Sequence, residues 1–100
     1  MDGHQQREVV SALERALRAG GALDAAGLRT GASAIRRLNQ LPVYDGVPDL
    51  LEEIAAGIEA HDTAGALSVA QQLREVIGDN PVALLVDNVM AALESLNGRR

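Results

Sequence analysis

The chain has 100 residues, of which 47% are hydrophobic and only Tyr44 is aromatic. Small aliphatic side chains pack well where helix backbones approach closely, and alanine is the strongest helix former. The composition therefore disfavours a sheet and predicts an all-α fold in one small domain. The absence of cysteine excludes disulfides and thiolate metal sites, and a net charge of −5 disfavours binding to phosphate backbones.

Charge is distributed unevenly along the chain. Residues 1–40 contain six arginines and four acidic residues, whereas residues 41–100 contain three arginines and ten acidic residues. No basic segment followed by an apolar stretch opens the sequence, and the apolar run at 81–93 is too short to span a bilayer. We therefore expect a soluble, cytoplasmic protein that does not bind membranes.

Residues 4–39 are predicted to form the first of two helical hairpins. Its first helix runs from about His4 to Ala19 and is expected to stop at Gly20-Gly21, and its second runs from about Ala22 to Asn39. Apolar residues recur at helical spacing in both segments.

Two glycines, Gly27 and Gly31, lie one turn apart inside this second helix. Each costs about 1 kcal/mol relative to alanine in a helix interior. We expect either that another helix crosses closely there or that the helix is interrupted near residue 31.

A loop at 40–47 separates this hairpin from a second one at 48–77, and a final helix follows at 81–97. Pro48 opens the third helix, Asp62 or Thr63 caps the fourth, and Pro81 occupies the first position of the fifth. The two hairpins overlay with a shift of about 40 residues, which places Ala25-Ala26 on Ala66-Leu67 and suggests an internal repeat.

Two stretches, "HDTAGAL…LREVIGDNP" and "GALDAAGL", share a polar turn followed by a helix that opens with small residues. Between them, residues 5–81 resemble tetratricopeptide repeats. Ala66 and Ala26 stand in the small positions, Leu67 follows Ala66 as the large residue, and Pro81 and Pro42 are the terminators. The resemblance implies antiparallel helix pairs stacked into a short superhelix whose concave side binds peptides or partner helices. Small bacterial proteins of this type often act as export chaperones or adaptors. A plain four- or five-helix bundle accounts for the same pattern.

The last helix carries more apolar side chains than one buried stripe requires. Either it is central in the bundle and covered by the other helices, or its excess face meets another chain as a homodimer seam or a partner groove. Burying one further Leu or Val contributes roughly 1.5–3 kcal/mol. The residues expected to bind the partner are Leu84, Leu85, Val89, Met90 and Leu93.

Tyr44, in the proline-containing loop, has two interpretations. It either folds over the helix ends and caps the bundle, or it is an exposed anchor for a partner, since aromatic residues concentrate at interface hot spots.

The stretch "LRTGASAIRRLNQ" suggests an alternative function as a small helix-turn-helix DNA-binding regulator. Arg29, Arg36 and Arg37 would then contact DNA from a helix that follows a turn near Gly31. Against this, the chain between Gly31 and Ile35 is short for such a turn. A solvated face whose arginines pair with acids of the third helix is the simpler interpretation.

No pattern in the sequence points to catalysis. His4 and His61 are the only histidines, and neither has a second metal ligand one turn away or a nucleophile at helical spacing. We expect no catalytic residue, no metal and no cofactor. The sequence thus predicts a non-enzymatic interaction module that binds another protein or itself.

Overall fold

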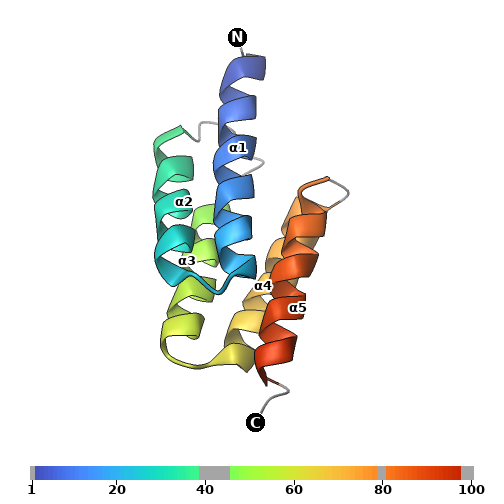
Figure 1. The fold of residues 1–100 in the computed structure, drawn as a ribbon. Coiled ribbons are helices and arrows are strands. Elements are labelled where there is room, and N and C mark those ends of the chain that lie inside the picture. Colours follow the sequence, from blue (N-terminus) through green and yellow to red (C-terminus); the bar gives the residue numbers. More distant parts are fainter. Residues whose placement is uncertain (1, 39–45, 79–80, 98–100) are drawn as a thin grey trace.

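The computed structural model describes residues 2–38, 46–78 and 81–97, without the side chains of residues 2–6 and 97. These residues form five helices and, within the described ranges, no strand (Figure 1). The helices are α1 (Asp2–Gly21), α2 (Ala25–Leu38), α3 (Val47–Glu59), α4 (Thr63–Ile77) and α5 (Ala83–Asn97). The all-α prediction is confirmed.

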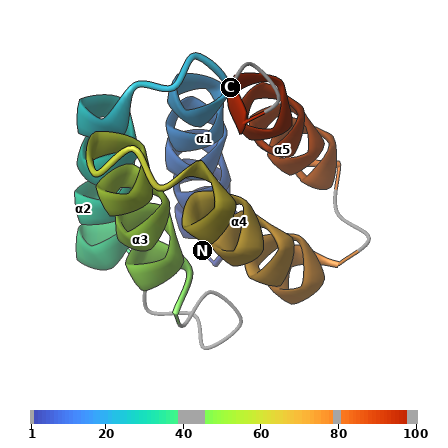
Figure 2. The same cartoon turned by 90° about the horizontal axis from the view of Figure 1, so that it is seen from below.

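Each helix packs against the next one along the chain, and α1 also packs against α5. Viewed from one end, α2, α1 and α5 form one layer and α3 and α4 form the other (Figure 2). Contact between the first and last helices closes the chain into a small bundle. This is one of the two arrangements that the sequence left open.

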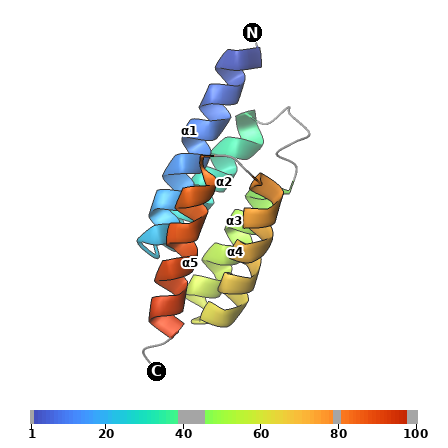
Figure 3. The same cartoon turned by 90° about the vertical axis from the view of Figure 1, so that its right-hand side faces the viewer.

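The bundle is elongated, with extents of 49 × 24 × 18 Å over the described residues. The N-terminal end of α1 projects beyond the other helices, as two side views show (Figures 1 and 3). The C-terminal half of α5 extends past the opposite end of α1 (Figure 1).

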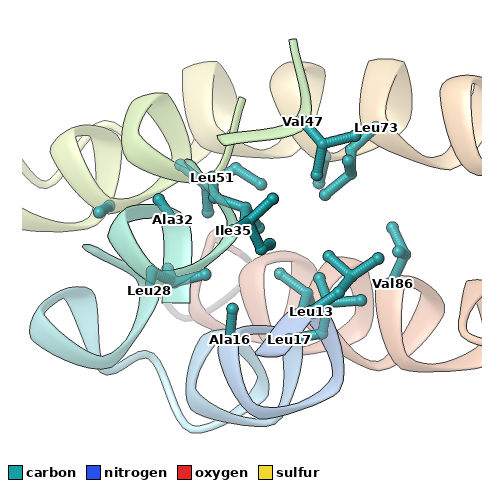
Figure 4. Packing of buried hydrophobic residues seen from close by; sticks show 14 of the residues in the cluster. Leu13, Ala16, Leu17, Leu28, Ala32, Ile35, Val47, Leu51, Leu73 and Val86 are labelled. Atoms are coloured by element: carbon teal, nitrogen blue, oxygen red, sulfur yellow. The ribbon is translucent and has the colours of Figure 1, made fainter. Parts of the chain in front are cut away.

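The core is aliphatic, and its largest side chains come from all five helices. Leu13 and Leu17 of α1 lie near Leu28 and Ile35 of α2, and Val86 of α5 points toward the same centre (Figure 4). Every residue in this group is at most 1% exposed. Burial of each such side chain contributes roughly 1.5–3 kcal/mol, which offsets much of the entropy lost on folding.

Small residues set how closely the helices of each hairpin approach. A Cβ atom built on Gly31 would lie 3.0 Å from Ala16 Cα and would overlap the Ala16 methyl group. In the second hairpin, a Cβ on Gly57 would lie 2.8 Å from Ala66 Cβ. Helix α2 runs unbroken through Gly31, so a close crossing, and not an interruption, explains this glycine.

Helix α1 ends at Gly21, close to the predicted stop at Gly20-Gly21, but both glycines belong to the helix. Gly20 is buried, and a Cβ there would lie 3.0 Å from a Val89 methyl group and 3.2 Å from a Leu28 methyl group. Its lack of a side chain lets α1 approach α5 and the start of α2. The helix ends at the next residue, Gly21, where the chain turns.

The turn between the two helices of each hairpin begins as a Schellman turn, and both hairpins share it. In the first, Asp24 N–H donates to Ala19 O at 2.8 Å and Leu23 N–H donates to Gly20 O at 2.9 Å, with Leu23 in the left-handed region at φ 59°. Asp24 then caps α2, accepting a hydrogen bond from Gly27 N–H at 3.2 Å. Because Asp24 is this cap, α2 begins at Ala25 and not at Ala22 as predicted.

The second hairpin repeats each of these bonds. Asp62 N–H donates to Gly57 O at 2.8 Å, His61 N–H donates to Ile58 O at 3.2 Å, and His61 also has φ 59°. Asp62 caps α4 by accepting from Gly65 N–H at 3.0 Å, which confirms the cap predicted from the sequence.

The two hairpins are therefore equivalent at an offset of 38 residues, the distance from Asp24 to Asp62. This corrects the overlay inferred from the sequence, which paired Ala25-Ala26 with Ala66-Leu67. At the new offset, identical residues recur across the hairpins: Val9/Val47, Leu13/Leu51, Glu14/Glu52, Ala22/Ala60, Asp24/Asp62, Ala26/Ala64, Gly27/Gly65, Ala32/Ala70 and Arg36/Arg74. Buried positions coincide as well, which supports the predicted repeat.

Two predicted boundaries also shift. Helix α3 begins at Val47, so this residue belongs to the helix and not to the 40–47 loop, and Gly46 precedes it at φ 86°. Pro81 lies in a turn, and α5 begins at Ala83. Residues 40–45 of the predicted loop, and Asn39 at the predicted end of the second helix, lie outside the described residues.

Replacing Gly31 and Gly21 by alanine should have opposite effects on stability. Gly31→Ala gains about 1 kcal/mol of helix propensity but overpacks the crossing at Ala16, so we expect a net loss of about 1 kcal/mol or more. A Cβ on Gly21 meets nothing closer than Asn88 Cβ at 4.0 Å, so Gly21→Ala should gain up to about 1 kcal/mol. Urea unfolding measures both, and a shift of the two variants in the same direction would contradict the close crossing.

Candidate partner-binding surface

The structure divides the five predicted partner-binding residues of α5 between core and surface. Val89 and Leu93 are 0% exposed, so the structure assigns them to the core and corrects their predicted place on a partner surface. Leu85 and Met90 are partly buried and pack against that core. Leu84 alone is well exposed, at 68%.

Helical geometry explains this division. Val82, Val86, Val89 and Leu93 recur at intervals of four and three residues and face the bundle interior. Leu84 lies about half a turn from that stripe and points away from the bundle. The apolar excess that the sequence indicated is therefore real, but it is narrower than predicted.

The large hydrophobic residues that the described part of the chain exposes all lie on α4 and α5. They are Val76 at 48%, Leu84 at 68% and Leu96 at 39%. Val76 and Leu96 are not among the binding residues predicted from the sequence. Each lies in the last turn of its helix, where neighbouring helices give less cover than a continuous apolar stripe implies.

One row of exposed residues along α5 is uncharged, with the exposed Glu94 beside it. Leu84, Asn88, Ala91 and Ser95 are all exposed and follow one another at intervals of four, three and four residues. Asp87 lies beside this face and is engaged by Arg74, whose Nε donates to its Oδ1 at 3.0 Å and thereby joins α4 to α5. We call Leu84, Asn88, Ala91 and Ser95 the outer face of α5.

Helices α2 and α3 present paired charged side chains to solvent. Between α2 and α3, Arg36 pairs with Asp49 at 2.6 Å and with Glu52, and Arg29 pairs with Glu59. These pairs confirm that arginines of the second helix meet acids of the third. The side chains are between 38% and 75% exposed, so each pair contributes roughly 1 kcal/mol or less.

Two features that the helix-turn-helix alternative requires are not found in the described residues. The turn that it requires near Gly31 is absent, since α2 is continuous from Ala25 to Leu38. Arg29 and Arg36 are already paired with carboxylates, with which DNA phosphates would have to compete. Arg37 is exposed on the same helix.

Of the remaining candidates, only His61 has a described side chain. His61 is exposed in the α3–α4 turn, and Tyr44 lies outside the described residues, as does the side chain of His4. No group of three or more His, Asp or Glu side chains in the described ranges is arranged to hold a metal ion. None of the described helices is both long and apolar enough to cross a bilayer.

Among the hollows that the described residues line between helices are two shallow ones. One, of about 360 Å³, lies over the α3–α4 crossing, with a floor that includes Gly57 and Ala66 and a rim that includes Glu53 and Asp62. The other, of about 260 Å³, lies between α1 and α2 and is lined by residues such as Ser11 and Arg15. Neither brings a nucleophile together with a histidine base.

No protein-family model matches the chain, and no curated protein or solved structure matches it. The resemblance to tetratricopeptide repeats therefore stays a prediction that rests on the residues quoted for it.

Substituting aspartate at Leu84 and at Val89 should separate surface from core. Leu84→Asp should change the free energy of unfolding by no more than about 0.5 kcal/mol, because the side chain is mostly solvated. Val89→Asp buries an unpaired charge and should abolish cooperative folding. Urea unfolding followed by circular dichroism tests this, and equal destabilisation by both variants would contradict the placement of Leu84.

Glycine in place of His61 should stabilise the protein. A residue with a Cβ costs roughly 1–2 kcal/mol in the left-handed region, and glycine removes this cost. Part of the resulting gain in stability is lost, because glycine has greater conformational freedom in the unfolded chain. We expect a net gain of about 0.5–1 kcal/mol. Ala56→Gly, at an exposed position inside α3, is the matched control and should lose about 1 kcal/mol. A loss of stability in His61→Gly would contradict the turn described.

Proposed function

We propose that this chain is a non-enzymatic protein–protein interaction module, an adaptor, export chaperone or self-associating subunit, that binds its partner through the α4–α5 hairpin. The observation that carries the proposal is the location of Val76, Leu84 and Leu96. These exposed large hydrophobic residues all lie on α4 and α5, whereas none of the described residues of α1 to α3 is an exposed large hydrophobic side chain.

The chemistry of the hairpin suits such a contact. Burying Leu84 together with Leu96 removes apolar surface from water, at roughly 25 cal/mol per Å². Asn88 and Ser95 on the outer face of α5 can donate and accept hydrogen bonds across an interface without the desolvation cost of a full charge. Interface cores are depleted in charged residues in the same way.

The α4–α5 hairpin is also held in shape before any partner arrives. Arg74 donates both to Asp87 on α5 and to Gly78 O at 3.1 Å, so it links the two helices and the end of α4. A preordered surface loses less conformational entropy on binding than a flexible one. This supports a preformed docking surface and not a segment that folds on binding.

Leu84→Asp should weaken partner binding without unfolding the protein. Tagged wild-type chain is expressed in its native host, the co-purifying protein is identified and purified, and calorimetry compares its affinity for wild type and variant. We expect a loss of at least 10-fold for Leu84→Asp, which corresponds to about 1.4 kcal/mol. Ser33→Asp, at an exposed position on α2, is the matched control and should leave the affinity unchanged.

Two results would contradict the proposal. One is equal affinity of wild type and Leu84→Asp for a stoichiometric partner. The other is a wild-type chain that sediments as a monomer at high concentration and retains no partner under gentle extraction.

A further inference from the structure

The 38-residue equivalence extends beyond the two hairpins to α5. Arg36 of α2 pairs with Asp49 of α3, and 38 residues later Arg74 of α4 pairs with Asp87 of α5. Helix α5 therefore stands to α4 as α3 stands to α2. It corresponds to the first helix of a hairpin unit, as α1 and α3 do.

This equivalence identifies the positions of α5 that correspond to the hairpin crossings. Ala92, Ser95 and Leu96 are equivalent to Ala16, Ala19 and Gly20 of α1 and to Ile54, Gly57 and Ile58 of α3. In the first unit, a Cβ on Gly27 of α2 would lie 2.5 Å from Ala19 Cβ, and a Leu28 methyl group lies 3.2 Å from the Cβ position of Gly20. In the second unit, Ala66 of α4 covers Gly57.

These three positions are less covered in α5 than in α1 and α3. In α1 and α3 they are buried or half-buried, whereas in α5 Ala92 is half-buried, Ser95 is exposed and Leu96 is 39% exposed. Helix α1 covers the preceding turn of α5, where Gly20 and Gly21 approach Val89 and Asn88. The C-terminal half of α5 extends past the end of α1 (Figure 1).

We infer that Ala92, Ser95 and Leu96 form a seat for the first turns of an amphipathic helix of a partner protein, which lies on α5 as α2 lies on α1 and α4 lies on α3. The inference rests on the proposed function and names the kind of partner. Gly27, Leu28 and Ala66 all belong to the first turns of their helices. The partner helix therefore carries glycine or alanine where it crosses Ser95, followed by an apolar residue that covers Leu96.

A segment of this chain can serve as the test helix for this seat. Residues 60–78, the second Schellman turn with α4, are appended after Asn97 in place of residues 98–100, because Ala60 is equivalent to position 98 at the 38-residue offset. If the seat accepts such a helix, the extended protein gains the far-UV ellipticity of the added helix and its Tm rises by about 5 °C or more. An unstructured extension with unchanged Tm would overturn the inference.

Ser95→Arg distinguishes docking on the seat from helix formation elsewhere. Ser95 is exposed, so the variant should leave the Tm of the native chain unchanged while removing the gain in Tm of the extended chain. A gain that survives Ser95→Arg would place the added helix elsewhere and overturn the inference. The inference would also be overturned if the native chain forms a dimer and Ser95→Arg dissociates it, because a second copy of the chain would then occupy the seat.

The seat and the proposed function can fail separately. If the extension does not dock but Leu84→Asp weakens partner binding, the hairpin binds its partner by the outer face of α5 alone. If the extension docks but Leu84→Asp binds the partner with unchanged affinity, the inference about the seat is supported and the proposed role of Leu84 is contradicted.

Discussion

The bundle depends on close approach between helix backbones at positions without large side chains. Gly31 faces Ala16 in the first hairpin, Gly57 faces Ala66 in the second, and Gly20 lets α1 reach α5. A protein with one aromatic residue cannot fill wide spaces between helices, so the helices must lie close for aliphatic side chains to pack at interior density. The glycines weaken helix propensity, and the packing that they permit offsets that cost.

Closure of the bundle decides which surfaces remain for binding. Helix α1 packs on both α2 and α5, so the apolar stripe of α5 that contains Val89 and Leu93 is enclosed. What stays exposed is the outer face that begins at Leu84, together with Leu96 near the end of α5, where the helix extends past α1. Ion pairs such as Arg36 with Asp49 occupy the opposite edge of the molecule, between α2 and α3. The exposed large apolar side chains thus gather on α4 and α5, beside the exposed charges of Glu75 and Glu94, and their location supports a role in protein binding.

The sequence predicts the helices well because periodicity and caps are local signals. Asp62 is recognisable as a cap from its own neighbourhood, whereas the role of Gly20 depends on Val89, far along the chain. Alanine-rich helices overlay at several offsets, so the sequence alone predicts the repeat at the wrong one. Only the hydrogen bonds of the turns at Asp24 and Asp62 fix the offset at 38 residues. Whether α5 is core or surface could not be derived from its apolar content, since the answer depends on where α1 ends.

Proton distances across the hairpin crossings test the account most directly. A NOESY spectrum of the isotopically labelled protein should contain cross-peaks between Gly31 Hα and the Ala16 methyl group, and between Gly57 Hα and the Ala66 methyl group. Both pairs lie at van der Waals contact only if the helices cross at their small residues. Absence of both cross-peaks, in a protein whose chemical shifts show α1 to α4 to be helical, would contradict the close approach on which the fold and its free surfaces depend.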